Sequence, residues 1–151
     1  MITPHYYSIV SGCAESEYEL VAFDKALLAA GIGDYNLVQV SSIMPAGCVF
    51  QEAVNLRKGS ILFAAYAKKT VKGNQPGSTA VAIAIPTCPE ENGVIFETSS
   101  DDADAEIIVI NMCREAMENR GRAIKEIRSS STSIQPVTDK YTCGLSAVVM
   151  W

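Results

Sequence analysis

The chain has 151 residues, of which 48% are hydrophobic and 19% charged, and its net charge of -5 comes from 12 basic and 17 acidic residues. This size fits a single domain with its own hydrophobic core, and the composition is that of a globular protein. We find no apolar run near the roughly 18 residues that span a bilayer. The basic residues are not clustered as a nucleic-acid partner would require.

Cysteine and histidine limit the chemistry that the chain can perform. An odd number of cysteines, with no two of them two to four residues apart, argues against a zinc site and against a disulfide framework. The N-terminal stretch MITPHYYSIV has no basic segment before an apolar core, so we expect no signal peptide and a cytoplasmic protein. We expect the single histidine, His5, to be a strand or surface residue.

In chain order, the first half predicts strands around one helix. Residues 5–10 predict a strand, and 17–33 predict a helix that stops near Gly31. Residues 36–42 predict the second strand and 60–71 the third. The turn-forming KGNQPGS, 72–78, is followed by the strand-like TAVAIAIP, 79–86, which predicts a hairpin. The apolar stripe expected on the helix is Leu20, Phe23, Leu27 and Ala30.

The second half predicts a strand at 93–100, a helix at 99–121 and two closing strands at 122–135 and 140–150. Serine and acidic residues crowd the first turn of this helix, where its dipole favours negative charge. Two helices among about seven strands indicate an α+β sandwich whose helices cover the outer sheet faces. The apolar stripe expected on the second helix is Ile107, Ile110, Cys113 and Met117.

Three motifs fit structural interpretations better than functional ones. GIG at 31–33 follows a helix rather than a strand, so we interpret it as a helix stop and not a dinucleotide site. GNQPGST at 73–79 lacks the lysine of a phosphate loop. The acidic cluster at 101–106 is interpreted as stabilising a helix N-terminus rather than as a cation site. Cys113 and Cys143 lie in apolar patterns and are expected in the core.

Two adjacent serines, Ser41 and Ser42, end the strand predicted at 36–42, in the stretch LVQVSSIMPAG. A serine hydroxyl held by a strained backbone can attack the preceding carbonyl and turn the amide into an ester. Elimination across the second serine then breaks the chain, and the resulting dehydroalanine hydrolyses to a pyruvoyl group. Ser-Ser pairs are common, so this spacing alone fits either a polar cap on a strand or a site of self-cleavage.

The segment AFDKALLAAGIGDYNLVQVSSIMP, 22–45, resembles the cleavage-site segment of pyruvoyl-dependent arginine decarboxylases. The resemblance continues in PGSTAVAIAIP, GVIFE and CGLSAVVMW, and is weakest at 46–58, where the proline-rich stretch of the family is missing. It implies a four-layer αββα sandwich, with two helices packed on mainly antiparallel sheets. It also implies that the single domain, 1–151, cleaves itself into a small chain, 1–41, and a large chain, 42–151.

Carried over by position, the resemblance implies a role for five residues. Ser42 becomes the pyruvoyl group and Ser41 the C-terminus of the small chain. Asn36 matches a position implicated in processing and in the site. Asp24 matches the acidic residue that receives the substrate guanidinium, and Glu97 matches the catalytic proton donor.

The resemblance further implies the reaction and its partners. The enzyme converts L-arginine to agmatine and carbon dioxide through a Schiff base to the pyruvoyl group, without a metal and without pyridoxal phosphate. The ketone acts as an electron sink for the electrons that decarboxylation leaves on the α-carbon. We expect a homotrimer of cleaved protomers, or a dimer of trimers, with sites between neighbouring subunits.

From the residues themselves, each carboxylate keeps a second interpretation. Glu97 follows an apolar run, so burial would keep it protonated near neutral pH, but it could also face solvent or pair with Arg114. Asp24 can hold a guanidinium through two charge-assisted hydrogen bonds, or it can lie on a solvated helix face beside Lys25.

Two alternative functions stay open at this point. One keeps the pyruvoyl chemistry and changes the amino-acid substrate. The other is a non-catalytic trimeric relative that never cleaves and acts as a binding or scaffold domain.

Overall fold

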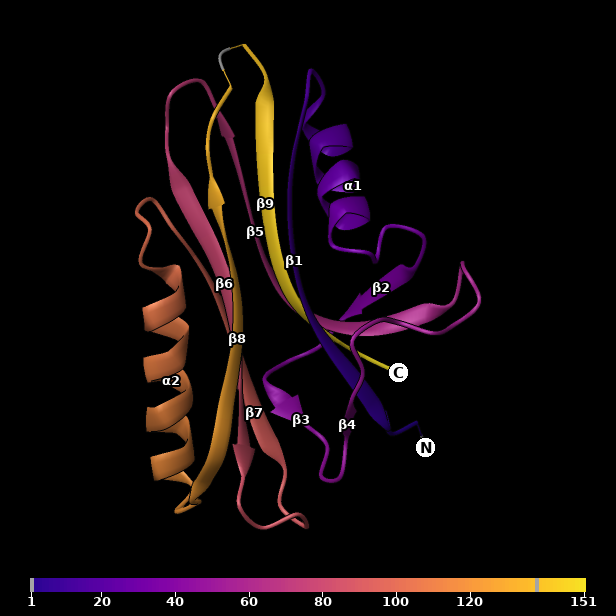
Figure 1. The fold of residues 1–151 in the computed structure, drawn as a ribbon, viewed down its shortest axis with the longest axis vertical. Coiled ribbons are helices and arrows are strands. Elements are labelled where there is room, and N and C mark those ends of the chain that lie inside the picture. Colours follow the sequence, from indigo (N-terminus) through magenta and orange to yellow (C-terminus); the bar gives the residue numbers. More distant parts are fainter. Residues whose placement is uncertain (1, 138) are drawn as a thin grey trace.

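The computed structural model describes residues 2–137 and 139–151, and in this part of the chain two helices and two sheets form four layers (Figure 1). The predicted α+β class and αββα sandwich are confirmed, with each helix on an outer face. Neither helix in the described part of the chain is long and apolar enough to cross a bilayer. The elements are β1 (Tyr6–Ser16), α1 (Glu19–Ala29), β2 (Asn36–Gln39), β3 (Ile43–Met44), β4 (Val49–Phe50), β5 (Ile61–Lys72), β6 (Gly77–Pro86), β7 (Gly93–Ser100), α2 (Ala105–Asn119), β8 (Ile124–Ile134) and β9 (Tyr141–Met150).

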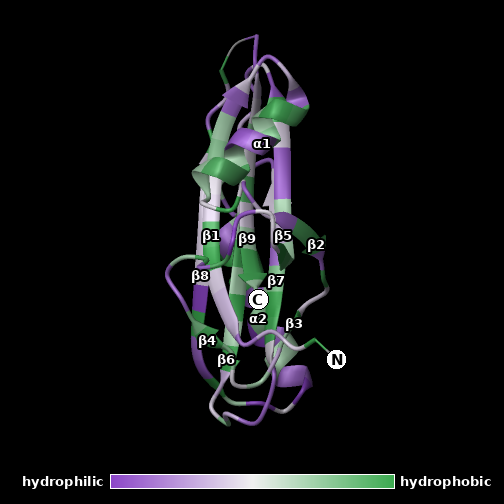
Figure 2. Cartoon of the chain, turned by 90° about the vertical axis from the view of Figure 1, so that its right-hand side faces the viewer, coloured by the Kyte–Doolittle hydropathy of each residue, from purple (hydrophilic) through white to green (hydrophobic). Residues whose placement is uncertain are grey.

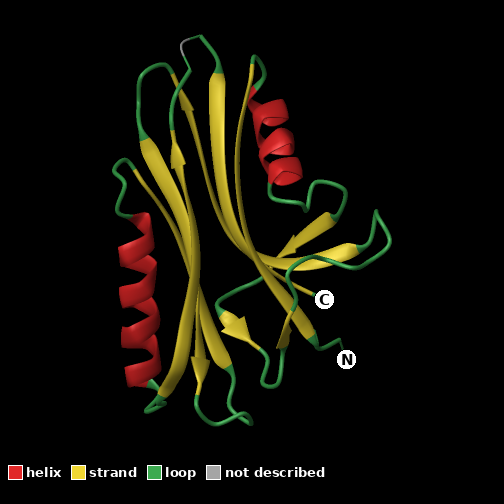
Figure 3. Ribbon diagram, viewed as in Figure 1, coloured by secondary structure: helices red, strands yellow, loops and turns green. Residues whose placement is uncertain are grey.

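The two sheets face each other between the helices (Figure 3). The five-stranded sheet has the order β2-β5-β9-β1-β4 and carries α1 on its outer face. The four-stranded sheet has the order β3-β7-β6-β8 and carries α2. Pairing is mainly antiparallel, with parallel pairs only at β1–β4 and β2–β5 among the described strands.

The hairpin predicted from 60–71 and 79–86 is wrong, although both strands and the turn exist. β5 pairs with β2 and β9 in one sheet, whereas β6 pairs with β7 and β8 in the other. Nine of the ten β6 residues are buried, so this strand needs covering on both faces and partners on both edges. The turn at Gly73, which has φ +80°, therefore joins two sheets.

Helix α1 packs mainly through small residues, and of the predicted stripe only Ala30 is among the buried residues. Its buried residues are Ala22 and Ala26, whereas Leu20 is 76% exposed. The reason is the close approach of α1 to β1, since a Cβ added at Gly12 would clash with the Ala26 carbonyl oxygen. Phe23 and Leu27 lie at the sides of this contact and are only partly buried.

Helix α2 has its buried face rotated from the predicted one. Ile107 is exposed, while Val109 is buried with Cys113 and Met117. The buried face packs on the alanine-rich outer face of β6, where Ala80, Ala82 and Ala84 point. The expectation that Cys113 and Cys143 are core residues is confirmed, since both are fully buried.

A chain of hydroxyl groups joins the two sheets. Ser11 on β1 lies 2.7 Å from Ser130 on β8 and 2.8 Å from Ser146 on β9, oxygen to oxygen. Ser146 in turn lies 2.9 Å from Thr79 on β6. Each of these four hydroxyl groups therefore has a partner, as buried polar groups require.

Candidate functional site

The bond between Ser41 and Ser42 lies where the chain crosses from one sheet to the other (Figure 1). The strand predicted to reach Ser42 ends instead at Gln39, and the Val40 N–H donates to the Ala64 carbonyl of β5 at 3.0 Å. Three residues later Ile43 pairs with Val94 on β7 in the other sheet. The strand stops early because its continuation pairs with a different sheet.

Two further backbone hydrogen bonds hold this crossing segment at the end where it enters β3. The Ile95 N–H donates to the Ser42 carbonyl oxygen at 2.8 Å, and the Ile43 N–H donates to the Ser41 carbonyl oxygen at 3.1 Å. The second bond spans i to i+2, which makes a γ-turn centred on Ser42. Neither serine has a positive φ or a cis peptide bond. Hydrogen bonds on each side, rather than a left-handed backbone, hold the segment.

The two serines face different surroundings. Ser41 is exposed and lines a cavity of about 220 Å³ together with Ile43, Phe63 and Met150, and the N-terminal residues Ile2 and Pro4 close one side. Ser42 is half-buried, and Met44, two residues after it, is buried in the inter-sheet core. The carbonyl carbon of Ser41 thus lies at the boundary between solvent and core.

Glu97 places a carboxyl group on the inner face of the four-stranded sheet. Side chains alternate along a strand, and Ile95, two residues before Glu97, packs in the inter-sheet core. Glu97 is half-buried, and its Oε2 is buried without a hydrogen-bond partner among the described residues. Burial raises the pKa of this carboxyl above its ordinary value of 4.5, against a smaller lowering by a backbone hydrogen bond. The alternative pairing with Arg114 is not formed, since that side chain donates to Asn111.

β7 is the element that links Ser42 and Glu97. Ile95 binds the Ser42 carbonyl directly, and Glu97 follows two residues later on the same strand face. A hydroxyl beside an acyl carbon and a carboxyl whose pKa is raised by burial are suited to acyl transfer and proton donation. Sequence reasoning missed Ile95, because its contribution is a main-chain N–H that only the strand register reveals.

Asn36 lies at the start of β2, on the strand that leads to the serines. Its Nδ2 donates to the Gly59 carbonyl at 2.9 Å, and its backbone N–H donates to the Ser60 carbonyl at 2.9 Å. These bonds attach the start of β2 to the start of β5. Within one protomer the Asn36 side chain therefore orients the strand rather than contacting Ser42.

Asp24 lies apart from the other three residues. It is exposed on α1, which covers the outer face of the five-stranded sheet, and among residues 2–137 and 139–151 its carboxylate has no hydrogen-bond or ion-pair partner. Glu97 faces the inner side of the opposite sheet. One protomer alone thus leaves Asp24 on a solvated helix face, as the second interpretation of this residue had it.

The outer face of α1 around Asp24 carries apolar residues among polar ones (Figure 2). Leu20 and Val21, one turn before Asp24, are 76% and 40% exposed, and Leu28, one turn after, is 51% exposed. Residues three and four apart share a helix face. Exposed apolar side chains thus lie one turn before and one turn after the Asp24 carboxylate.

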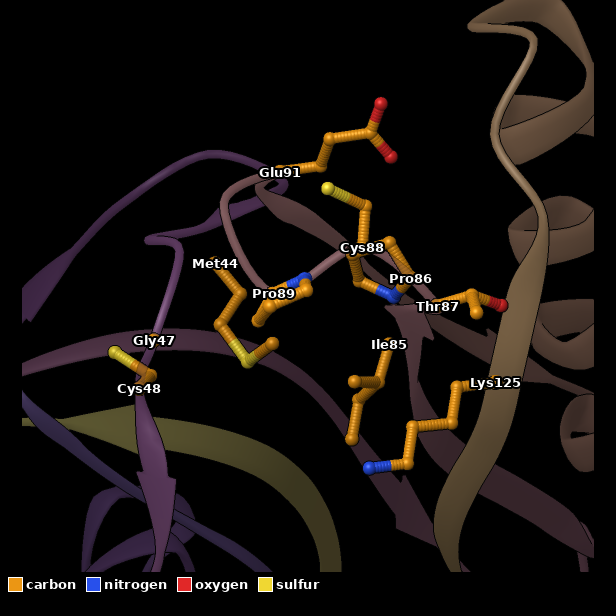
Figure 4. A pocket seen from close by; sticks show the side chains of 10 residues that line it. All are labelled: Met44, Gly47, Cys48, Ile85, Pro86, Thr87, Cys88, Pro89, Glu91 and Lys125. Carbon is orange, nitrogen blue, oxygen red and sulfur yellow. The ribbon is translucent and has the colours of Figure 1, made fainter.

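A second hollow of about 160 Å³ lies at the other end of β3 (Figure 4). Met44 and Cys48 form one wall, Ile85 and Lys125 another, and Cys88 and Glu91 come from the β6–β7 turn. None of the residues that the resemblance implicates lines it. We therefore place the candidate site at the Ser41 side of β3.

Comparison with known proteins gives full-length matches. The family model described as "Pyruvoyl-dependent arginine decarboxylase (PvlArgDC)" matches residues 6–151. A protein of that name from Methanothermobacter thermautotrophicus is 38% identical over 94% of this chain and 93% of its own length. Relatives of the same name from Pyrococcus furiosus and Methanopyrus kandleri are 36% and 31% identical, covering 99% and 100% of this chain and 97% and 99% of their own lengths.

Proposed function

The chain belongs to the pyruvoyl-dependent arginine decarboxylase family, and from that premise we propose that the Ser41–Ser42 bond cleaves itself to generate the cofactor. The protein is an arginine decarboxylase that uses a pyruvoyl group. The observation that carries this function is the family match over residues 6–151. The product is agmatine, which is arginine less its carboxylate carbon and two oxygens.

The cleavage we propose uses the Ser42 hydroxyl as nucleophile. Its Oγ bonds to the Ser41 carbonyl carbon, the amide C–N bond breaks, and the freed amine takes up the hydroxyl proton. Loss of the Cα proton of residue 42 then expels the Ser41 carboxylate and leaves dehydroalanine. Water replaces the nitrogen of its imine tautomer, which releases ammonia and leaves the ketone.

The residues around the bond fit a group of this kind. Hydrogen bonds from Ile95 and Ile43 hold the segment, and the buried Oε2 of Glu97 has no partner among the described residues. The pyruvoyl ketone supplies an electron sink for decarboxylation. We assign Glu97 the delivery of a proton to the substrate α-carbon, because burial favours its protonated form. Asn36 supports processing and the site by holding β2 in place.

The guanidinium of arginine is assigned to Asp24 of a neighbouring copy of the chain. Asp24 and Glu97 lie on opposite sides of the five-stranded sheet, so one protomer cannot present both to a single substrate. The exposed Leu20, Val21 and Leu28 around Asp24 support contact with another subunit, since such apolar surface favours burial. We propose a homotrimer, or a dimer of trimers, with sites between subunits.

The two fragments stay together after cleavage in this proposal. β1 of the small chain lies between β9 and β4, which both belong to the large chain, and it pairs with β9 from Tyr7 to Ser16. The chain therefore remains one domain, 1–151, with a nick at 41–42. The free state of all five cysteines supports a reducing, cytoplasmic setting.

The function is tested by measuring carbon dioxide release from a panel of amino acids. We expect release from L-arginine with one equivalent of agmatine, and none from Ser42→Ala. The matched Ser131→Ala variant, at an exposed position of β8, is expected to keep full activity. Carbon dioxide release from a different amino acid, and not from L-arginine, would make that amino acid the substrate. A fully folded protein that releases none from any amino acid would favour the non-catalytic scaffold.

A further inference from the structure

The γ-turn at the serine pair contains a donor that the assignments above do not use. The Ile43 N–H points at the Ser41 carbonyl oxygen, with the nitrogen 3.1 Å away. This oxygen belongs to the carbonyl that the Ser42 hydroxyl attacks in the proposed cleavage. Among residues 2–137 and 139–151, Ile43 is the donor that the structure gives to this oxygen.

The strand register leaves this N–H free for the task. Ile43 pairs with Val94, and the ladder bond on that side runs from the Ile95 N–H to the Ser42 carbonyl. In an antiparallel pair of this kind the residue between the bonded positions directs its own N–H away from the partner strand. Ile43 can therefore donate to Ser41 without losing a sheet hydrogen bond.

We propose that the Ile43 N–H stabilises the oxyanion that forms on the Ser41 carbonyl oxygen during chain cleavage, an inference that rests on the proposed function. When the Ser42 Oγ bonds to the carbonyl carbon, the electron pair of the C=O π bond moves to this oxygen. A hydrogen bond to a charged oxygen is shorter and about twice as strong as one to a neutral oxygen. The donor thus stabilises the intermediate more than the intact peptide, which lowers the barrier.

The surrounding bonds pre-position this donor. Val40 is anchored to Ala64 in the five-stranded sheet, and Ser42 is anchored to Ile95 in the four-stranded sheet. The Ser42 carbonyl and the Ile43 N–H belong to one planar peptide unit, so the bond from Ile95 sets the direction of this N–H. The bond from Val40 only limits where the segment begins. A preorganised donor of this kind costs no rearrangement when the charge forms.

The test replaces the Ile43 amide by an ester, with the α-hydroxy acid analogue of isoleucine at position 43. The precursor is assembled in denaturant by ligation at Gly47–Cys48, and refolding starts cleavage, which is followed by intact-mass spectrometry. The matched control places an ester at Val40, which removes the anchor to Ala64 but leaves the Ile43 N–H. Ile43→Val, made in the same way, keeps the N–H and tests the side chain. Circular dichroism confirms that each precursor refolds.

We expect the Ile43 ester to slow cleavage between residues 41 and 42 about 100-fold, while the Val40 ester and Ile43→Val stay within about tenfold of the all-amide chain. An Ile43 ester that cleaves within about tenfold of the all-amide chain, or a Val40 ester that slows it equally, overturns the role of this N–H. If the all-amide chain refolds and never cleaves at this bond, the proposed function itself fails and the inference falls with it.

Discussion

The main-chain N–H of Ile95 donates a hydrogen bond to the carbonyl oxygen of Ser42 at 2.8 Å. This contact attaches the serine pair to β7, the strand that carries Glu97. It also makes the crossing between the two sheets a fixed part of the fold rather than a free loop. The peptide bond proposed for self-cleavage is thus held from both sheets.

Replacing Glu97 by glutamine is expected to lower kcat for arginine decarboxylation by about 100- to 10,000-fold, because a positioned proton donor contributes a factor of this size. Gln keeps the shape but cannot release a proton. Steady-state carbon dioxide release measures the effect, with exposed Glu115→Gln on α2 as control. A Glu97→Gln enzyme with unchanged kcat would remove Glu97 from the proton-donor role.

The same residue predicts a pH dependence of stability. Burial raises the pKa of Glu97 above 4.5 in the folded protein, so the folded state retains a proton that the unfolded state loses. Stability from this group is fully present below pH 4.5 and falls as pH rises through the raised pKa. We expect Glu97→Gln to gain stability relative to the wild type across that range in urea titrations. A difference that stays constant with pH would mean that Glu97 titrates normally.

Replacing Asp24 by asparagine is expected to raise KM for arginine about 10- to 100-fold and to leave chain cleavage intact, since a charge-assisted pair with the guanidinium is lost. The kinetics are compared with those of Glu118→Gln, which removes an exposed carboxylate from α2. Unchanged arginine kinetics in Asp24→Asn would exclude Asp24 from the substrate pocket.

The hydroxyl chain between the sheets predicts a stability effect away from the site. Ser146→Ala leaves the Ser11 and Thr79 hydroxyls each without one partner, which should lower the free energy of unfolding by about 1–3 kcal/mol. Chemical denaturation measures this, and exposed Ser131→Ala is expected within about 0.5 kcal/mol of the wild type. Equal stability of the two variants would show that the hydroxyl chain between the sheets contributes nothing to the free energy of unfolding.

Local patterns predict most elements of this fold and not their partners. Alternation at 60–71 and 79–86 identifies β5 and β6, but which sheet each joins depends on pairing with β9 and β8, far along the sequence. For the same reason the sequence does not reveal that β2 ends at Gln39. Residues 36–42 have the composition of one strand, and only pairing with β5 and with β7 divides this stretch of the chain between two sheets.

Apolar residues three and four apart predict part of each buried helix face, since Ala30, Cys113 and Met117 are buried. The rest of each face depends on contacts between small residues. Alanines of α1 lie against Gly12, and α2 lies on the alanines of β6. Close packing favours small residues at such contacts and leaves Leu20 and Ile107 exposed. For the site, resemblance supplied Ser42, Glu97, Asn36 and Asp24, whereas the backbone donors Ile43 and Ile95 follow only from the strand register.

Intact-mass spectrometry of the purified, denatured protein tests the central claim most directly. We predict two species, residues 1–41 and residues 42–151, the larger beginning with a pyruvoyl group and so resistant to Edman degradation, and one uncut chain for Ser42→Ala. A wild-type protein that decarboxylates arginine at full rate while its chain runs unbroken from Met1 to Trp151 would contradict the claim.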